Sequence, residues 1–423
     1  MVFLYNLAIA LMYMAIVIAA PFNRKARKLL QGHRHLLRRL RVTLSNNEVP
    51  ILWFHAASTG EFEQGRPVME EIRRLYPQYK ILLTFFSPSG YEAKKNYAGA
   101  DYIFYIPFDF SWNVQRFYQI VKPQAIFFIK YEFWYNFIHH AYLSGIPLFC
   151  FSAIFRPNQV FFSWYGGWYR RLLLKFDFIF VQNRQSELLL NQIGMRQVEV
   201  CGDTRFDRVA QIASTSKHLP AIDAFAGQSR VIIAGSTWPP DEALLVRYYN
   251  EKLAEHPSIK YIIVPHEVDD EKHLKDLAAA FKGNVIRYSQ ISNEQNLSNY
   301  RILIIDVMGI LSSVYRYGCI AYIGGGFGKG IHNILEAATY GIPVLFGPRF
   351  QKFQEAVDLT SRQGAFSVGS YKSFAQTMDD LLNDDKLYSL ACQVCKNYVQ
   401  ENLGSTQRIL QKIEPILKQH AKK

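Results

Sequence analysis

The sequence IGGGFGKGIHNILEAATYGIPVLFGP, residues 323–348, is the stretch that decides the fold. It predicts the end of a strand, a glycine-rich turn, a helix that opens at His332–Asn333, and a second short strand. Five of the eight residues from 323 to 330 are glycines, which let the backbone approach a ligand closely and leave main-chain N–H groups free. Glu336, in the first turn of the predicted helix, is placed to bind a sugar hydroxyl. The stretch therefore indicates a nucleotide site.

Neither of two common phosphate-binding motifs describes this stretch. It lacks the Gly-Lys-Ser/Thr ending of a Walker A loop, and it lies far from the start of the fold, where the GxGxxG motif usually occurs. A glycine turn in an ordinary α/β fold is the simplest alternative. The H-N-x-x-E sequence and the following G-x-P-V-L strand together favour the nucleotide site.

Strand-like and helix-like segments alternate in two series, and a chain of 423 residues is too long for one ordinary core. The first series predicts strands at Ile51–His55, Ile81–Phe85, Tyr102–Ile106, Ala125–Ile129, Leu148–Ser152, Phe178–Val181 and Val198–Cys201. The second predicts them at Val231–Ala234, Tyr261–Val264, Val285–Arg287, Ile302–Ile305, Ala321–Ile323 and Val344–Phe346, with helices filling most of the remaining chain. Such alternation is typical of parallel sheets covered on both faces.

The polar segment Ile212–Gln228 is the expected boundary between the two series. The sequence therefore predicts an α/β protein of two doubly wound, Rossmann-like domains facing a cleft, at residues 23–215 and 216–423. Ligands of such sheets bind beyond the carboxyl ends of the strands. Two such sites facing each other would make an enzyme with two substrates.

The N-terminus predicts a membrane anchor at residues 1–22. Residues 1–23 contain no charged residue or histidine, and eight Lys and Arg residues follow before the first acidic residue, Glu48. The apolar run is about long enough to cross a bilayer. Its charges follow the apolar core instead of preceding it, which argues against a cleaved signal peptide. The positive-inside rule places the body of the protein on the cytoplasmic side, and the sequence leaves open whether the segment spans the bilayer or lies in its interface.

The net charge of +13 predicts an anionic partner, which could be nucleic acid, a membrane surface or a phosphorylated substrate. The anchor favours an anionic lipid surface over nucleic acid. Five cysteines suit a reducing compartment, and the single C-x-x-C pair at Cys392 and Cys395 does not predict a zinc site. No other metal motif or G-x-S-x-G elbow occurs.

Polar residues follow two predicted strands of the first domain. Glu61 comes after the strand Ile51–His55 and the turn Ala56–Gly60, where it could act as a general base or simply cap a helix. Glu132 follows the strand Ala125–Ile129, and a carboxylate so close to a buried strand usually has a partner or a task. Binding a substrate hydroxyl and pairing with Lys130 or an arginine are equally open for Glu132.

Four strand ends of the second domain carry polar residues or glycines. Besides the glycine-rich segment, these are Ala234–Thr237, Pro265–His266 and Asp306–Gly309. Any one of them alone could be an ordinary loop. Their joint occurrence at equivalent places predicts a common binding edge.

These motifs together resemble a known family, the 3-deoxy-D-manno-octulosonic acid (Kdo) transferases of lipopolysaccharide assembly. The resemblance covers nearly the whole chain: the anchor with its basic flank, WFHAASTGE, TFFSPSG, YEFWYN, GDTRFD, AGST, DVMG, the glycine-rich H-N-x-L-E segment and GPRFQKF. It implies the GT-B fold and the transfer of Kdo from CMP-Kdo to a lipid A precursor (lipid IVA), with inversion at the anomeric carbon. It implies no metal and no cofactor in the transfer. It also implies a place at the inner membrane, with the catalytic domains on the cytoplasmic side.

Carried over by position, the resemblance assigns each candidate site residue a role. Glu61 is the expected catalytic base. The expected contacts of the acceptor or of Kdo are Glu132, Ser87, Ser89, Gly90 and Arg205. The expected CMP site consists of Ser236, Thr237, Pro265, His266, Met308, Gly309, Ile310, Gly326, His332, Asn333, Ile334, Leu335 and Glu336. Many family members have arginine where this chain has His266, glutamate where it has Ile310, histidine where it has Trp238 and lysine where it has Arg205.

Two other functions fit part of the sequence. One is a membrane-associated GT-B transferase that uses a UDP-sugar and a lipid-linked acceptor. The other is a membrane-tethered anion-binding protein without catalysis. A preference for CMP over UDP would separate the first from Kdo transfer, and the loss of transfer in a Glu61 variant that still binds CMP would exclude the second.

Overall fold

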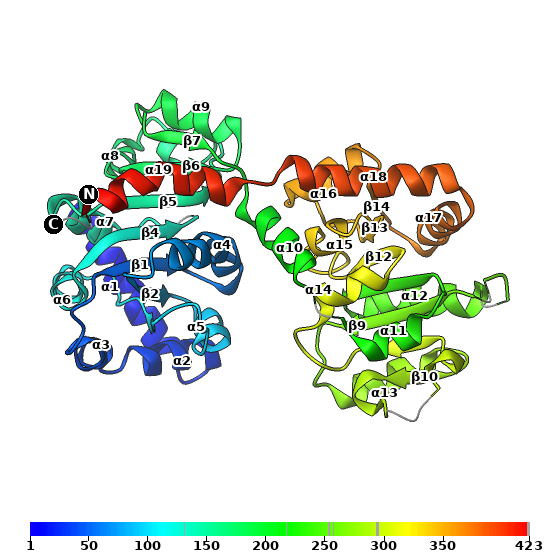
Figure 1. The fold of residues 1–423 in the computed structure, drawn as a ribbon. Helices are drawn as coiled ribbons and strands as arrows, with labels where there is room; N and C mark the ends of the chain where they lie inside the picture. Colours follow the sequence, from blue (N-terminus) through cyan, green and yellow to red (C-terminus); the bar gives the residue numbers. More distant parts are fainter. Residues whose placement is uncertain (131, 217, 253, 257, 293–295, 421–423) are drawn as a thin grey trace. The chain divides into compact units, whose positions relative to one another are not determined.

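The computed structural model describes residues 1–130, 132–216, 218–252, 254–256, 258–292 and 296–420. The chain divides into two compact units, and the division falls within helix α10 (Thr204–Ser214). Unit 1 comprises Met1–Arg208 and Leu403–Lys423, and unit 2 comprises Val209–Asn402. Each unit contains one parallel sheet covered by helices (Figure 1).

Unit 1 is built around a sheet of seven parallel strands in the order β3-β2-β1-β4-β5-β6-β7. Its strands are β1 (Ile51–Ala56), β2 (Lys80–Phe85), β3 (Tyr102–Tyr105), β4 (Pro123–Ile129), β5 (Leu148–Ala153), β6 (Phe178–Val181) and β7 (Val198–Val200). Its helices are α1 (Val2–Ala19), α2 (Arg24–His33), α3 (Leu36–Leu44), α4 (Thr59–Leu75), α5 (Pro88–Lys94), α6 (Ser111–Val121), α7 (Tyr135–Leu143), α8 (Gly167–Leu173), α9 (Arg184–Gln192) and α19 (Ser405–His420). Separate apolar clusters pack on the two faces of the sheet, so the central strands are buried throughout.

Unit 2 contains a second sheet of seven parallel strands, in the order β10-β11-β9-β8-β12-β13-β14. Its strands are β8 (Val231–Thr237), β9 (Lys260–Pro265), β10 (Val285–Arg287), β11 (Ile302–Ile304), β12 (Ile320–Ile323), β13 (Val344–Phe346) and β14 (Ala365–Ser367). Its helices are α11 (Pro220–Ala226), α12 (Pro239–Lys252), α13 (Glu271–Ala280), α14 (Leu311–Val314), α15 (Leu335–Ala338), α16 (Gln354–Ser361), α17 (Tyr371–Asn383) and α18 (Asp385–Glu401). Every strand predicted from the sequence is present, and β14 was not predicted.

The C-terminal helix α19 corrects the predicted extent of the second domain. The sequence assigned residues 216–423 to that domain, whereas residues 403–423 belong to unit 1 (Figure 1). The reason is hydrophobic: Ile409, Ile413 and Leu417 of α19 are buried in a core cluster of unit 1. Asp207 also holds the start of α19 in place. Its carboxylate accepts hydrogen bonds from the backbone N–H groups of Gly404 and Thr406 at 2.7 and 2.6 Å.

Two further details differ from the predictions. The segment Ile212–Gln228, expected as the boundary between the domains, contains the end of α10 and the whole of α11, and the division falls earlier, after Arg208. The helix expected to open at His332–Asn333 begins at Leu335 and has four residues. By length and composition, α1 is the one helix among the described residues that could cross a membrane.

Candidate active site

The strand order changes direction at the same kind of place in both sheets. In unit 1, β1 lies between β2 and β4, and His55 of β1 is paired with Phe128 of β4. In unit 2, β8 lies between β9 and β12, and Gly235 is paired with Ile323. The carboxyl ends of doubly wound sheets bind ligands at such switch points. Glu61 follows β1 and Glu132 follows β4 in unit 1, and Ser236 lies at the end of β8 in unit 2.

Glu61 lies in the first turn of α4, which follows β1. Its Oε2 accepts a hydrogen bond from the backbone N–H of Ala57 at 2.6 Å, so the carboxylate folds back over the strand end. Burial raises the pKa of the Glu61 carboxyl, and the negative charge of Glu132 raises it further. The Ala57 hydrogen bond and the charge of Lys130 act in the opposite direction. The net result is a carboxylate that accepts a proton more readily than an exposed glutamate.

Glu132 is held between two ring nitrogens. Its Oε2 accepts a hydrogen bond from Trp134 Nε1 at 2.7 Å and lies 3.2 Å from Nε2 of His55. His55 is fully buried in β1, and its Nδ1 lies 2.9 Å from Thr84 Oγ1 on the neighbouring strand β2. The sequence left open whether Glu132 pairs with a cation or binds a substrate hydroxyl, and here two side chains fix one of its oxygens.

The turn after β2 lies against the turn that carries Glu61. The Ser87 backbone N–H donates a hydrogen bond to the Ala57 carbonyl at 2.8 Å, and the hydroxyls of Ser87 and Ser89 are 2.7 Å apart. Gly90 is buried, and a Cβ there would lie 3.3 Å from the Ser58 backbone. Ser89 and Gly90 belong to the first turn of α5. The structure thus brings the loops after β1 and β2 together.

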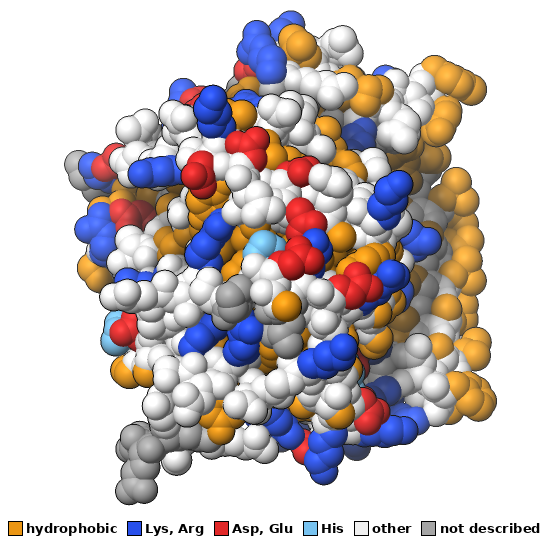
Figure 2. Space-filling view, turned by 90° about the vertical axis from the view of Figure 1, so that its right-hand side faces the viewer, with side chains coloured by type: hydrophobic (Ala, Val, Ile, Leu, Met, Phe, Trp, Pro, Cys, Tyr) orange, Lys and Arg blue, Asp and Glu red, His pale blue; other side chains and the backbone are white. Residues whose placement is uncertain are grey.

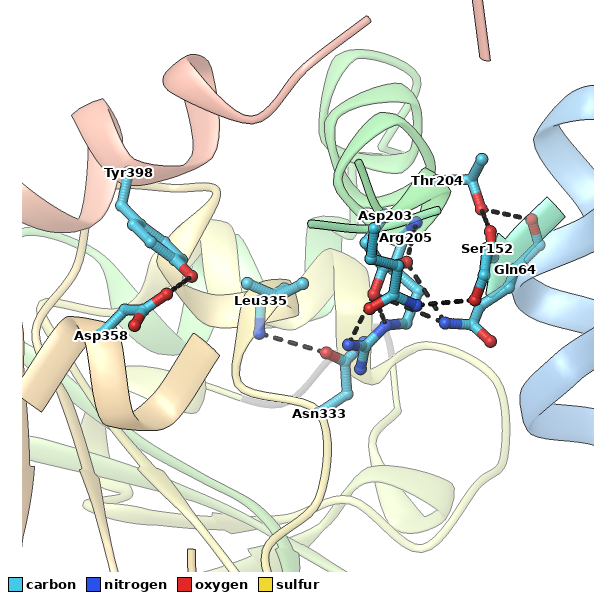
Figure 3. Close-up of polar contacts among 10 residues, drawn as sticks. Gln64, Ser152, Asp203, Thr204, Arg205, Asn333, Leu335, Asp358 and Tyr398 are labelled. Carbon is cyan, nitrogen blue, oxygen red and sulfur yellow. Dashed lines mark hydrogen bonds and ion pairs between the residues drawn. The ribbon is translucent and has the colours of Figure 1, made fainter. Parts of the chain in front are cut away.

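Arg205 is oriented by Asp203 (Figure 3). The Asp203 carboxylate accepts hydrogen bonds from Arg205 Nε at 2.8 Å and from the Arg205 backbone N–H at 2.9 Å. Gln64, one turn beyond Glu61 on α4, donates to the same carboxylate at 3.3 Å. Thr204 adds a hydrogen bond to the Gln64 carbonyl and a 2.9 Å contact with Ser152. The GDTRFD segment is therefore fastened to the helix that carries Glu61.

The glycine-rich segment of unit 2 is packed against the end of β8. A Cβ on Gly324 would lie 2.2 Å from the Ser236 carbonyl oxygen, and a Cβ on Gly326 would lie 2.6 Å from the Gly347 backbone. Asp241 on α12 holds the turn, because its carboxylate accepts hydrogen bonds from the Gly325 N–H at 2.9 Å and the Tyr322 hydroxyl at 2.7 Å. The glycines therefore allow backbone to meet backbone. Gly326, expected at the nucleotide, is buried in this packing.

Three rings stack beside the glycine-rich segment. Trp238 and His266 have ring centroids 4.6 Å apart, and His266 and His332 have centroids 4.5 Å apart. The indole Nε1 donates to His332 Nε2 at 3.3 Å, which leaves the proton of a neutral His332 on Nδ1. Burial lowers the pKa of His332, and His266 lowers it further. His266 itself is exposed at the end of β9.

The H-N-x-x-E sequence forms a small hydrogen-bonded loop (Figure 3). Asn333 Nδ2 donates to Glu336 Oε1 at 3.1 Å, and Asn333 Oδ1 accepts from the Leu335 N–H at 3.2 Å. Ile334 and Leu335, both predicted to contact the nucleotide, are buried in the core. Their side chains support the loop, and Asn333 and Glu336 are its partly exposed polar members.

The other predicted residues of unit 2 differ in their environments. Ser236 has a left-handed backbone conformation at the end of β8, whereas the Thr237 hydroxyl is buried and donates to Glu242 at 2.9 Å. Pro265 is buried at the end of β9. The remaining three residues follow β11, two positions from β8 in the sheet order: exposed Met308, exposed Gly309 with a positive φ of 90°, and partly buried Ile310.

Comparison with known proteins gives a family for this geometry. Residues 34–208 match the family model described as 3-deoxy-D-manno-octulosonic-acid transferase (kdotransferase). Curated 3-deoxy-D-manno-octulosonic acid transferases align over most of the chain. The Aquifex aeolicus protein is 27% identical over 79% of this chain and 87% of its own length, and the Haemophilus influenzae protein is 26% identical over 87% and 88%. The chain is thus similar to Kdo transferases over most of its length.

Solved structures confirm the fold. The UDP-GlcNAc 2-epimerase from Neisseria meningitidis matches with a TM-score of 0.59 at 17% identity, covering 87% of this chain and all of that one. Another UDP-N-acetylglucosamine 2-epimerase matches with a TM-score of 0.57 at 14% identity, over 89% and 98% of the two chains. At these identities the likeness concerns the fold, which is GT-B, and the similarity to Kdo transferases supports a glycosyltransferase.

Several residues around the candidate site of this transferase were missing from the sequence prediction. His55 and Thr84 stand behind Glu132, Gln64 and Asp203 orient Arg205, and Asp241 holds the glycine-rich turn. One signal was available: His55 is a polar residue inside an otherwise apolar strand. The pairing of Gln64 with Asp203 spans 139 residues, and no local pattern indicates it.

Proposed function

We propose that this protein transfers Kdo from CMP-Kdo to a phosphorylated lipid A precursor, lipid IVA, with inversion at the anomeric carbon. Similarity to the Kdo transferase family model and to curated Kdo transferases supports the sugar that is transferred. The paired carboxylates Glu61 and Glu132 at the switch point of unit 1 support a reaction that needs a base.

The single observation that carries this proposal is the environment of Glu61. Burial and the nearby charge of Glu132 raise its pKa, as a general base for a hydroxyl requires, while the Ala57 hydrogen bond fixes its direction. In the proposed step Glu61 takes the proton of the acceptor hydroxyl, and the oxygen bonds to the anomeric carbon of Kdo. The bond between that carbon and the phosphate oxygen breaks, and CMP leaves with the electron pair.

The rest of unit 1 would orient the acceptor and Kdo. Glu132 offers the oxygen that His55 and Trp134 leave open to a sugar hydroxyl. Arg205, held by Asp203, offers positive charge to a carboxylate or phosphate. The hydroxyls of Ser87 and Ser89 lie on the turn that contacts the Glu61 loop.

Unit 2 would bind the CMP part of the donor. The ring stack of Trp238, His266 and His332 offers a flat face and ring N–H groups, and His266 is exposed to a ligand. Glu336 is a partly exposed carboxylate suited to ribose hydroxyls. Met308, Gly309 and Ile310 follow β11 and would form a neighbouring part of the site.

The anchor and the basic segment after it would keep the enzyme at the cytoplasmic face of the inner membrane. Residues 24–47 contain only basic charges, which attract anionic headgroups. Both proposed substrates carry phosphate, so the net charge of +13 suits them as well.

Mass spectrometry of products formed from CMP-Kdo and a tetra-acylated lipid A precursor tests this function. A product heavier by one or more Kdo residues supports it, and the number of residues added is read from the same spectrum. Calorimetry with CMP and UDP tests the nucleotide separately. Preferential binding of UDP would contradict the proposal and favour a UDP-sugar transferase.

A further inference from the structure

The N-terminal helix α1 is fastened to unit 1 by polar side chains near its start. The Tyr5 hydroxyl donates to Asp109 at 2.5 Å and accepts from the Tyr135 backbone N–H at 3.1 Å. Asn6 Oδ1 accepts from Asn136 Nδ2 at 2.9 Å. Asp109 is 1% exposed, and it also accepts from the first-turn N–H groups of α7. Tyr5 thus completes a buried network at the start of the helix that follows Glu132 and Trp134.

This attachment is incompatible with α1 crossing the bilayer. Residues 5 and 19 of one helix are about 20 Å apart along its axis, at about 1.5 Å per residue. A spanning helix would carry Tyr5 and Asn6 toward the far leaflet, away from a domain that follows its other end. The buried Asp109 would then lose its hydroxyl donor, and Asn6 its partner. The contacts therefore place α1 along the domain instead of away from it.

The side of α1 that faces away from unit 1 is exposed and apolar. Phe3, Leu4, Leu7, Leu11 and Ile18 are exposed, whereas Ile9 is buried against the domain. Figure 2 shows hydrophobic side chains in a column along one edge of the surface. Exposed apolar surface of this extent marks a membrane or protein contact.

Between α1 and helices α2 and α3 lies a groove with a volume of about 1020 Å³. Its apolar walls come from α1, α3 and the segment before α6, and include Met14, Val17, Leu37, Phe108 and Trp112. The groove reaches toward the carboxylates of unit 1 through a row of rings. Phe108 contacts Phe86 with centroids 6.3 Å apart, and Phe86 contacts Trp134 at 5.1 Å.

The rim of the groove is basic. Arg34 and Arg38 line it and are exposed, and residues 24–47 contain no acidic residue. An apolar groove with a cationic rim, next to an exposed apolar helix, matches a lipid with an anionic headgroup. The basic rim favours an anionic lipid over a neutral apolar peptide as the occupant of the groove.

We propose that this groove binds an acyl chain of an anionic membrane phospholipid, with its phosphate at Arg34 and Arg38, while α1 lies in the plane of one leaflet. The inference goes beyond sugar transfer and does not depend on it. A lipid held there would fix the depth of unit 1 at the membrane surface.

Trp112 in the groove provides the measurement. Two sets of vesicles contain the same fractions of phosphatidylglycerol and phosphatidylcholine. In the first set only phosphatidylglycerol has brominated acyl chains, and in the second set only phosphatidylcholine has them. Quenching is measured for the unsubstituted protein and for Trp112→Phe. The difference between the two is the quenching of Trp112 itself, and it reports the lipid in the groove. We expect this difference to be at least threefold larger when bromine is on phosphatidylglycerol. Equal quenching per brominated lipid in the two sets would overturn the proposal.

Paired charge variants supply the control. Arg34→Gln with Arg38→Gln and Arg24→Gln with Lys25→Gln remove the same charge, and the second pair lies outside the groove lining. Both pairs should weaken binding to anionic vesicles by roughly thirtyfold. With vesicle-bound protein, the preference for brominated phosphatidylglycerol should vanish in the first pair and remain in the second. Loss in both pairs, or displacement of that signal by a lipid A precursor, would refute occupation by a membrane phospholipid.

The orientation of α1 has its own readout. The Val2→Cys variant should react with a membrane-impermeant maleimide in inside-out vesicles and remain unlabelled in intact spheroplasts. The unsubstituted chain corrects for its own five cysteines. Labelling from the outer face would show that α1 spans the membrane and would contradict the in-plane placement.

Discussion

Both sheets have seven parallel strands, but they differ in strand order and in the residues at their switch points. In unit 1 the strand ends carry charged side chains, Glu61 and Glu132, which are fixed by hydrogen bonds from Ala57, His55 and Trp134. In unit 2 the strand ends carry glycines and stacked rings, and Asp241 holds the turn internally. The difference suggests a division of labour in which unit 1 performs proton transfer and unit 2 recognises the nucleotide.

The largest expected effect tests the chemical side of this division. Glu61→Gln keeps the shape of the side chain and removes the base, so transfer should fall by about 10²- to 10⁴-fold. CMP affinity, measured by calorimetry, should stay unchanged because the substitution lies in unit 1. Glu63→Gln is the matched control, since Glu63 lies on the same helix and pairs with Lys94. Transfer at the unaltered rate in Glu61→Gln would assign the base to another residue.

The second prediction concerns unit 2, where a substitution should weaken CMP binding. Gly324→Ala places a Cβ 2.2 Å from the Ser236 carbonyl oxygen and should push the turn away from β8. We expect CMP to bind roughly tenfold more weakly, which corresponds to about 1.4 kcal/mol. In Gly328→Ala the new Cβ has an ordinary 3.4 Å contact, and affinity should persist. Thermal unfolding of both variants distinguishes a local displacement from loss of the fold, and normal CMP affinity in Gly324→Ala would contradict the placement of the site.

The pH dependence sharpens the role of the carboxylate pair. The pKa of Glu61 is raised by burial and by the charge of Glu132, so transfer should fall on acidification through a pKa above that of an ordinary glutamate. Glu132→Gln removes one negative charge, which lowers the pKa of Glu61 and moves the acid limb of kcat/KM to lower pH. The measured quantity is the pH at which kcat/KM falls on the acid side, not the maximum value of kcat/KM. An unmoved limb would show that the two carboxylates are not coupled.

The smallest expected effect concerns the ring stack. Trp238→Phe keeps an aromatic ring but removes the hydrogen bond to His332 Nε2. A neutral hydrogen bond contributes about 0.5–1.5 kcal/mol, so CMP affinity should drop by about two- to tenfold. Transfer at saturating CMP-Kdo should remain. A fall in the saturated rate with no change in affinity would place the stack in the chemical step.

The sequence predicted the framework well because its strands are fully buried. A parallel strand covered on both faces, such as Phe178–Val181, appears as a continuous apolar run. The strand Ala365–Ser367 was missed because a run of three residues gives no periodic signal. The return of α19 was missed for another reason, since an amphipathic helix does not indicate which sheet it covers.

The site was predictable where a residue follows a strand directly. Glu61, Glu132 and His266 lie at strand ends, as expected. Ile334, Leu335 and Gly326 share the same motif but are buried, because a motif includes both the residues that face a ligand and those that pack behind them. The groove beside α1 depends on Tyr5 meeting Asp109, 104 residues away, which the sequence pattern does not reveal.

The return of α19 to unit 1 makes unit 2 an inserted domain. The chain leaves unit 1 after Arg208 and re-enters it at Leu403. The segment 209–402 is therefore a continuous piece that can be cloned alone, whereas a fragment ending at Arg208 lacks the helix that covers Tyr79 and the core around it. A soluble unit 1 requires a short artificial linker from Arg208 to Leu403. This shortened chain would contain the carboxylate pair, Glu61 and Glu132, without unit 2.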